Sequence, residues 1–337
     1  MARPRAAGVL SDLDHANLLP EYTMWRFPAL LLTLILAASS SGGRTAPPSD
    51  KLLGRWDITI HTPTGDRPSW LEIWLSGREA LVGQMTGVVG SARPIGKIDA
   101  SGDSLHYSIP AQWEAGMGDL VVQGRLDGER LVGSMTFPDG QAYDWTANRA
   151  PSLHRQRPPV WGAPIRLLHV NDFGGWKAVG GASDTNQWVV KNGLLQSPHS
   201  GRNVMTERTF DDFKLHIEFR YPKGSNSGVY LRGRYEVQIQ DDYGLDPAND
   251  RFSGVYGFLA PSVITARPPD AWQSYDVTLV GRMVTVVANG RTVICNREIP
   301  GITGGALDSK EGTAGPLMLQ GDHGPIEYRN IVLTPAK

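Results

Sequence analysis

Apolar and polar residues alternate with a period of two through much of this 337-residue chain. In the segment FKLHIEFRY, for example, Phe213, Leu215 and Ile217 alternate with polar neighbours. Successive side chains of a strand point to opposite faces, so this pattern predicts half-buried β-strands. Helical spacing of apolar residues is scarce, and turn residues separate the short runs. The pattern therefore predicts an all-β protein.

A first β region is expected over residues 52–150, with strands at RWDITIH, SWLEIWL, LVVQGRL and YDWTANR. Leu81–Gly83 and Leu131–Gly133 repeat the same Leu-Val-Gly segment, and each follows a turn and precedes Met-Thr. Two repeats are too few for a solenoid, so we expect a small antiparallel β-barrel or meander domain. Its tryptophans either fill the core or form a platform for a sugar; they are Trp56, Trp70, Trp74, Trp113 and Trp145.

A Pro- and Arg-rich linker over residues 151–164 separates this region from a second one, residues 165–337. Such a linker is expected to be extended and exposed. Asn289-Gly290 predicts a two-residue hairpin turn between two of the later strands. Many alternating strands with almost no helix predict two packed antiparallel sheets, a sandwich that folds on its own.

The first 45 residues have the order of a secretory signal peptide. Arg26 precedes an apolar run, Phe27–Ala38, and small residues follow it. The run is shorter than the ~20 residues that span a bilayer. Acidic residues precede Met24, so we expect Met24 to be the true start and the residues before it to be an extension. We therefore expect a periplasmic or extracellular protein without stable membrane insertion; an uncleaved anchor is the alternative.

Composition excludes some classes of function. The net charge of −1 argues against a nucleic-acid-binding protein, which needs a basic surplus to meet phosphates. The single Cys295 allows no internal disulfide and is expected to be a buried or half-buried strand residue. Compact metal motifs are absent from the sequence, so no cofactor is expected; the acidic segment DDYGLDPAND leaves calcium as an alternative.

The second region resembles the 3-keto-disaccharide hydrolase domain family over residues 165–334. The motifs that carry the resemblance are LLHVNDFGGWKAVGG, WVVKNGLLQS, FDDFKLHIEFRYPKGSNSGVYLRG, YEVQIQDD, AWQSYDVTLVGRMVTVVANG and GPLMLQGDHGPIEYRNIVL. The resemblance implies a concanavalin A-like lectin/glucanase jelly roll whose concave sheet binds carbohydrate. Two positions depart from the family pattern: residues 169–172 replace an Asn-Gly-Lys turn, and Gln273 replaces an Asn.

The segment YEVQIQDD supplies the first candidates for a site. Tyr235, Val237 and Ile239 fit the core, which leaves Glu236 and Gln238 on the opposite face. The resemblance makes that face concave, although a solvated surface is the other interpretation. The catalytic candidates are Glu236 and His323, and the substrate-binding candidates are Asn226, Tyr230, Arg232, Gln238, Asp241, Trp272 and Gln320.

The resemblance implies an exported enzyme that cleaves glycosides already oxidised at C3 of the sugar. A base removes the proton at C2, the group at C1 leaves, and water adds. Chemistry leaves Glu236 or His323 as the base, and Arg232 or Gln238 as the group that stabilises the enolate oxygen. The alternatives are a lectin-like carbohydrate-binding protein of the cell envelope and a module whose first β domain docks a partner.

Overall fold

The computed structural model describes residues 47–180 and 186–337. Thr45–Lys337 form one compact unit, and the expected signal peptide lies outside the described residues. Within the described part, helical structure is limited to one 3-10 turn, η1 (Asp50–Leu52), and no helix has the length and hydropathy needed to cross a bilayer. The predicted all-β class is confirmed.

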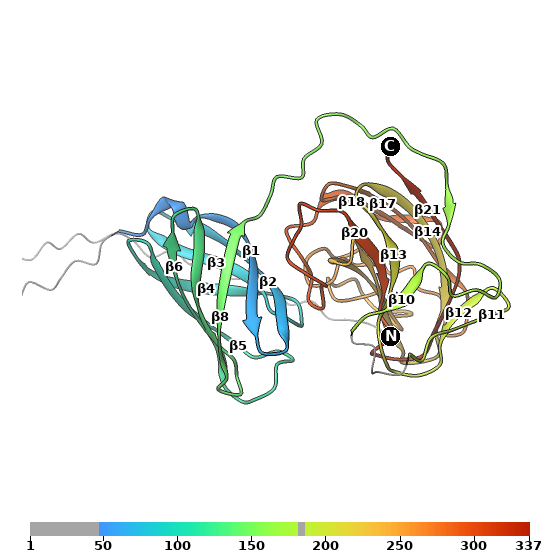
Figure 1. Cartoon of the computed structure of the whole chain (residues 1–337), viewed down its shortest axis with the longest axis horizontal. Helices are drawn as coiled ribbons and strands as arrows, with labels where there is room; N and C mark the ends of the chain where they lie inside the picture. Colours follow the sequence, from blue (N-terminus) through green and yellow to red (C-terminus); the bar gives the residue numbers. More distant parts are fainter. Residues whose placement is uncertain (1–46, 181–185) are drawn as a thin grey trace, which may run out of the picture. The chain divides into compact units, whose positions relative to one another are not determined.

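The first β region is a closed antiparallel barrel of eight described strands, drawn from blue to green in Figure 1. Each strand pairs with the next, and the last pairs with the first. Of the two alternatives, barrel or meander, the structure has the barrel. The strands are β1 (Gly54–Thr62), β2 (Gly65–Ser76), β3 (Ala80–Thr86), β4 (Ala92–Ser101), β5 (Ser104–Pro110), β6 (Asp119–Asp127), β7 (Arg130–Thr136) and β8 (Ala142–Arg149).

The repeated Leu-Val-Gly segments lie on β3 and β7, which occupy equivalent places in the two halves of the barrel. A Cβ atom on Gly83 would lie 2.3 Å from the Glu72 carbonyl oxygen, and one on Gly133 would lie 1.9 Å from that of Gln123. Neither position has room for a side chain. The glycine of each repeat therefore lies where the backbone of the neighbouring strand approaches closely.

The barrel tryptophans divide between core and surface. Trp56 and Trp145 are buried in the barrel core. Trp70 is also buried, but it belongs to the sandwich core, where its ring meets Phe258 edge to face at 5.4 Å. Trp74 and Trp113 are exposed. The barrel and the sandwich therefore share apolar packing through Trp70.

The second region is a jelly-roll sandwich of two antiparallel sheets. The smaller sheet has the order β10-β13-β20-β15-β16, and the larger has β11-β12-β21-β14-β17-β18-β19 with β9 beside β21. The strands are β9 (Ile165–Arg166), β10 (Trp176–Ala178), β11 (Val189–Lys191), β12 (Leu194–Ser197), β13 (Val204–Phe210), β14 (Phe213–Arg220), β15 (Asn226–Leu231), β16 (Tyr235–Gln240), β17 (Gln273–Val280), β18 (Met283–Ala288), β19 (Arg291–Glu298), β20 (Gly315–Leu319) and β21 (Ile326–Pro335).

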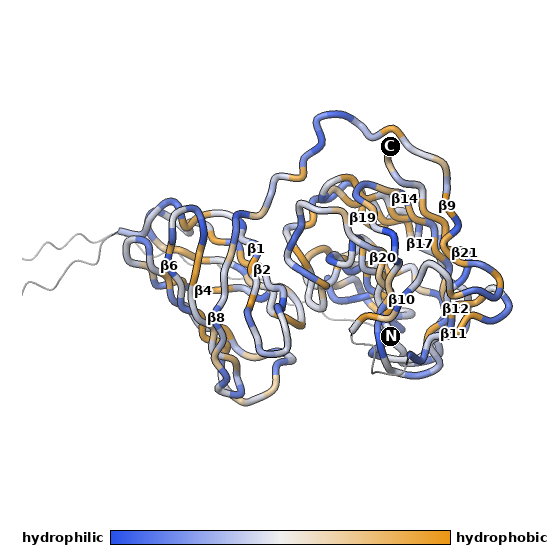
Figure 2. Tube along the Cα trace, viewed as in Figure 1, coloured by the Kyte–Doolittle hydropathy of each residue, from blue (hydrophilic) through white to orange (hydrophobic). Residues whose placement is uncertain are grey.

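Alternation places one face of each sheet in the core, as the changing colours along the strands in Figure 2 illustrate. Val229 and Val237 of the smaller sheet and Ile217 and Val277 of the larger sheet are all buried in it. The prediction of burial is wrong for Cys295, which is exposed where the register between β18 and β19 shifts after the buried Ile294.

Three of the described hairpin turns use paired positive φ angles, one of them Asn192-Gly193 between β11 and β12. Asn289 and Gly290, with φ of 51° and 80°, join β18 to β19 as the sequence predicted. Arg232 and Gly233, with φ of 53° and 68°, join β15 to β16. Arg232 therefore stands in a turn, where the alternation of β15 no longer decides which way a side chain points.

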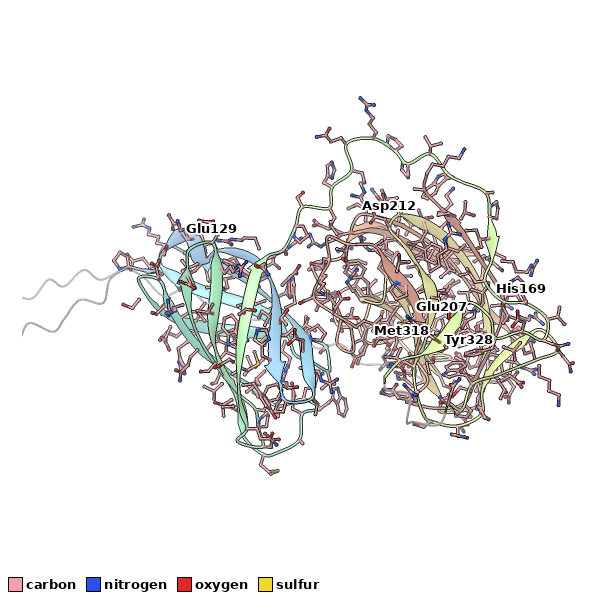
Figure 3. All side chains as sticks on the ribbon, viewed as in Figure 1. Glu129, His169, Glu207, Asp212, Met318 and Tyr328 are labelled. Atoms are coloured by element: carbon pink, nitrogen blue, oxygen red, sulfur yellow. The ribbon has the colours of Figure 1, made fainter. Side chains whose placement is uncertain are left out.

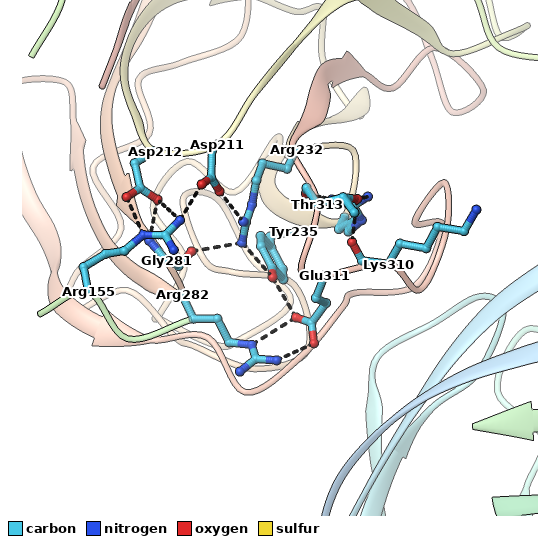
Figure 4. Close-up of polar contacts among 11 residues, drawn as sticks. Arg155, Asp211, Asp212, Arg232, Tyr235, Gly281, Arg282, Lys310, Glu311 and Thr313 are labelled. Atoms are coloured by element: carbon cyan, nitrogen blue, oxygen red, sulfur yellow. Dashed lines mark hydrogen bonds and ion pairs between the residues drawn. The ribbon is translucent and has the colours of Figure 1, made fainter. Parts of the chain in front are cut away.

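A buried polar network surrounds the β15–β16 turn (Figure 4). Arg282 donates to both carboxylate oxygens of Glu311 at 2.6 and 3.1 Å, and the Tyr235 hydroxyl donates to the same carboxylate at 2.6 Å. Burial, followed by the nearby charge of Glu311, raises the pKa of barrel residue Asp57 to about 9. The raised pKa favours the protonated form of Asp57 beside Glu311.

We expect Glu311→Ala to lower the free energy of unfolding by about 3–5 kcal/mol, because it leaves the buried Arg282 charge without its partner. The matched control is Glu298→Ala, which breaks the 2.6 Å ion pair of a half-exposed carboxylate with Arg55. That change should cost no more than about 1 kcal/mol. Urea denaturation measures both, and equal losses would contradict the network's role.

Candidate active site

A cavity of about 600 Å³ lies against the polar face of the smaller sheet. Its floor comes from β15 and β16, and its rim comes from loops of the sandwich and the barrel. The floor residues are Asn226, Tyr230, Glu236, Gln238 and Gln240; the sandwich rim includes Asn203, Asp250, Tyr256, Gln320, Asp322 and His323; the barrel contributes Val89, Gly90 and Trp113.

A wider hollow of about 850 Å³ lies on the barrel strands β5–β8, where Gly124 and Gly133 carry no side chains. Its titratable residues His106, Arg125 and Asp144 are exposed. The sandwich cavity instead holds a carboxyl group that is 3% exposed, that of Glu236. Buried acids with shifted pKa values in a concave site are typical of catalytic sites, so the sandwich cavity is the candidate site.

Glu236 reaches the cavity because of its place in the β15–β16 ladder. Its strand neighbours Tyr235 and Val237 are buried in the sandwich core, so alternation turns Glu236 to the other face. A Cβ atom on Gly228 of β15 would lie 2.1 Å from Glu236 Oε1. The glutamate side chain therefore lies over the space that this glycine leaves.

The Glu236 carboxyl group shares a hydrogen-bonded chain with Tyr230. The Tyr230 hydroxyl oxygen lies 2.9 Å from Glu236 Oε2 and 2.9 Å from the Gly304 carbonyl oxygen, yet it carries one proton. Burial raises the pKa of Glu236 to about 8, against the opposing effects of Tyr230 and His323. The protonated acid can donate to Tyr230, which then donates to Gly304.

Amide side chains provide the other hydrogen-bonding groups of the cavity. In one amide orientation Gln238 Nε2 donates to Gln240 Oε1 at 3.1 Å, and in the flipped orientation it lies 3.3 Å from Glu236 Oε1 and donates to it. Asn226 Nδ2 donates to Gln240 Oε1 at 3.0 Å. Gln320 is 7% exposed, and its Oε1 has no hydrogen-bond partner among the described residues. A ligand hydroxyl would satisfy this buried acceptor.

His323 stands on the rim with an acidic neighbour. Its Nδ1 lies 2.7 Å from Asp322 Oδ1. This hydrogen bond raises the pKa of His323 against the effect of burial, and the Glu236 charge acts in the same direction. The pairing orients the ring through Nδ1 and leaves Nε2 for a ligand. His323 and Glu236 therefore line one cavity, and the charge of each affects the pKa of the other.

A family model described as a 3-keto-alpha-glucoside-1,2-lyase-like domain matches residues 165–334. The chain belongs to this family. No curated protein matches the chain significantly.

Solved structures resemble about half of the chain. A predicted glycosyl hydrolase from Parabacteroides distasonis is 28% identical, with a TM-score of 0.43, over 53% of this chain and 92% of its own. A second one from the same organism is 16% identical, with a TM-score of 0.43, over 52% of this chain and 94% of its own. The carbohydrate-binding module CBM66 from Bacillus subtilis is 16% identical, with a TM-score of 0.29, over 47% of this chain and 93% of its own.

The cavity of this lyase-like domain gathers six of the predicted site residues: Asn226, Tyr230, Glu236, Gln238, Gln320 and His323. The structure places the other three elsewhere. Arg232 points from its turn into the buried network, where it donates to Asp211 Oδ1 and the Gly281 carbonyl oxygen, each at 3.0 Å. Its assignment to the site is therefore corrected.

Asp241 and Trp272 also lie outside the cavity lining. Asp241 Oδ2 accepts the Gly224 N–H at 2.9 Å and so closes the turn before β15. The Trp272 ring packs under the Arg329 guanidinium at 3.8 Å. The neighbouring family departure, Gln273, bonds to Arg267 and supports a loop, so it leaves the cavity unchanged.

Sequence reasoning missed several lining residues. Asp322 carried a signal, because it directly precedes His323. Trp113 was one of five tryptophans in the platform alternative, and it lines the cavity. Asn203 and Tyr256 come from loops whose approach depends on the tertiary fold, so local patterns gave no signal for them.

The acidic segment that left calcium as an alternative is partly used for structure. Asp242 Oδ2 accepts the Phe252 N–H at 2.7 Å, and Oδ1 accepts from Gln240 Nε2 at 3.1 Å. Within the described ranges, no three His, Cys, Asp or Glu side chains gather as metal ligands. Calcium binding stays untested.

The raised pKa of Glu236 predicts a pH-dependent stability. A carboxyl whose pKa rises from 4.5 to about 8 on folding stabilises the fold fully below pH 4.5 and loses this contribution as pH rises through 8. Relative to Glu236→Gln, the parent should therefore lose on the order of 3–5 kcal/mol of unfolding free energy between pH 5 and 9. Urea denaturation across this range measures it.

The control is Glu207→Gln, an exposed carboxyl on β13 (Figure 3). Its stability curve should follow that of the parent. Parallel curves for the parent and Glu236→Gln would show that the buried carboxyl does not titrate in this range.

Proposed function

We propose that this protein is a carbohydrate-active enzyme that cleaves glycosides carrying a ketone at C3 of the sugar. Two findings support the proposal: the family to which the chain belongs, and the buried Glu236 carboxyl beside His323 in an amide-lined cavity. The second observation carries it, because a site that only binds sugar has no need of a titrating buried acid. Export through residues 1–45 remains part of the proposal.

Glu236 acts as the general base. A ketone at C3 acidifies the proton at C2, and a carboxylate with a pKa of about 8 is a stronger base than an ordinary one. At neutral pH roughly a tenth of Glu236 is ionised, given this pKa. As Glu236 takes the C2 proton, the electron pair of the C2–H bond forms the C2–C3 double bond of an enolate.

The cavity amides stabilise the enolate. Negative charge develops on the oxygen at C3, where preorganised donors lower the barrier. Gln238 takes this role in place of Arg232, whose side chain is committed to the buried network. The buried acceptor Gln320 Oε1 receives a sugar hydroxyl and orients the ring.

His323 acts as the general acid. The enolate electrons return to form the C1–C2 double bond and the C3 ketone, and the C1–oxygen bond breaks. Protonated His323 gives its proton to the departing oxygen, and Asp322 keeps it charged through the bond that raises its pKa. Water then adds across C1 and C2, with oxygen at C1 and a proton at C2, to complete the cleavage.

Replacing the base while keeping its shape should remove turnover. We expect Glu236→Gln to lower kcat on a 3-keto-α-glucoside by about 10²-fold or more. Glu207→Gln, the exposed control on β13, should retain the parent rate. A loss confined to KM would mean that Glu236 only holds a hydroxyl. Binding without turnover by the parent would favour the lectin-like alternative.

The acid assignment predicts a change in the pH profile. The parent rate should pass through a maximum with pH, because turnover needs ionised Glu236, whose pKa is about 8, and protonated His323. Asp322→Asn removes the hydrogen bond that raises the pKa of His323, so the limb that reports His323 should move to lower pH. An unmoved limb would exclude His323 as the acid.

A further inference from the structure

The cavity has two walls of different chemistry. The sandwich wall presents carboxyl and amide groups, among them Glu236 and Gln238. The barrel wall consists of Val89, Gly90 and Trp113, and its side chains have no charge. Val89 is 38% exposed and Trp113 is 70% exposed, so a large aromatic surface stands open beside the polar floor.

Trp113 is held in place by its own loop. The Glu114 carboxylate accepts the N–H groups of Gln112 and Trp113 at 2.9 and 3.2 Å. The same carboxylate forms a largely buried ion pair with Arg93 at 2.5 Å. A buried carboxylate that organises consecutive backbone groups fixes the loop, so the indole is exposed on a rigid support.

The barrel loops also contact the sandwich beside the cavity. The Gly305 N–H donates to the Val88 carbonyl oxygen at 3.0 Å. A Cβ atom on Gly304 would lie 2.2 Å from the Gly90 carbonyl oxygen, so these backbones touch. Trp113 and Tyr256 line the cavity together, and the indole opposes the rise in the pKa of the Tyr256 hydroxyl that burial causes. These contacts set the position of the indole relative to the polar floor.

The polar side chains around Trp113 are occupied within the barrel. Gln112 Oε1 accepts the Ser91 N–H at 2.9 Å, and its Nε2 donates to Ser91 Oγ at 3.0 Å. Glu114 is bound to Arg93. A second sugar ring would bring several hydroxyls that need partners, whereas a flat apolar ring needs only contact area. The barrel wall therefore suits a flat apolar ring better than a second sugar ring.

Resting on the proposed function, we propose that the barrel forms the subsite for the leaving group. Trp113 stacks on the aglycone while the sandwich floor holds the oxidised sugar. The substrates are then 3-keto-glucosides of aromatic or similarly flat apolar alcohols. This assigns the barrel a role in selecting the substrate by its aglycone.

The test compares phenyl and methyl 3-keto-α-glucosides with the full chain. Trp113→Ala should lower the ratio of kcat/KM for the phenyl glucoside over the methyl glucoside by about 10-fold, since only the phenyl aglycone has an aromatic ring that can stack on Trp113. Trp113→Phe should restore most of the ratio. The matched control is Trp74→Ala, a 42% exposed tryptophan on β2 outside the cavity lining, which should leave the ratio unchanged.

An unchanged ratio in Trp113→Ala would overturn the subsite. So would a loss on a 3-keto-disaccharide that equals or exceeds the loss on the phenyl glucoside, because the wall would then hold a second sugar. Calorimetry with the unoxidised phenyl and methyl α-glucosides tests the subsite even if the parent turns over no 3-keto-glucoside. Trp113→Ala should weaken phenyl binding selectively, and equal parental affinity for both ligands would refute the inference while leaving the proposed reaction to its own test.

Discussion

The pairing of β15 with β16 is the constraint on which the site depends. One face of this hairpin fills the sandwich core with Val229 and Val237, and the other presents Tyr230 and Glu236 to the cavity. A slip of one residue would exchange the faces, placing a carboxylate in the core. The apolar residues of the hairpin therefore determine both the packing and the position of the acid. The cost of burying Glu236 is also what raises its pKa into a useful range.

The barrel completes this arrangement from outside the family domain. Trp70 enters the sandwich core, Asp57 meets the network that secures the β15–β16 turn, and Trp113 reaches the cavity rim. Apolar packing, a buried pair of carboxyl groups and an aromatic wall thus join the two regions at three points. Under the proposed function, a residue outside the matched region then influences which glycosides are selected.

Local pattern predicted the strands and the residues of the hairpin. Alternation placed Glu236 and Gln238 together, and Asn289-Gly290 marked the turn between β18 and β19, because both signals depend only on neighbouring residues. The same alternation failed at Arg232, where a left-handed turn redirects the side chain into a network built from distant segments.

The remaining failures have the same tertiary origin. Cys295 is exposed where the register between β18 and β19 shifts, and register is a property of the paired strands. The composition of the chain suggested several tryptophans as a platform, but only contact between the barrel and sandwich loops distinguishes Trp113 from Trp56. The burial that shifts the pKa of Glu236 likewise depends on the complete cavity.

The most direct test of the account follows the hydrogen at C2. The cleavage of a 3-keto-α-glucoside is run in deuterium oxide, and early product is examined by NMR before spontaneous exchange. Removal of the C2 proton followed by hydration predicts deuterium at C2 of the released 3-keto-sugar, formed by the parent and not by Glu236→Gln. Rapid cleavage that retains the original hydrogen at C2 would contradict the account, because the glycosidic bond would then break without the deprotonation assigned to Glu236.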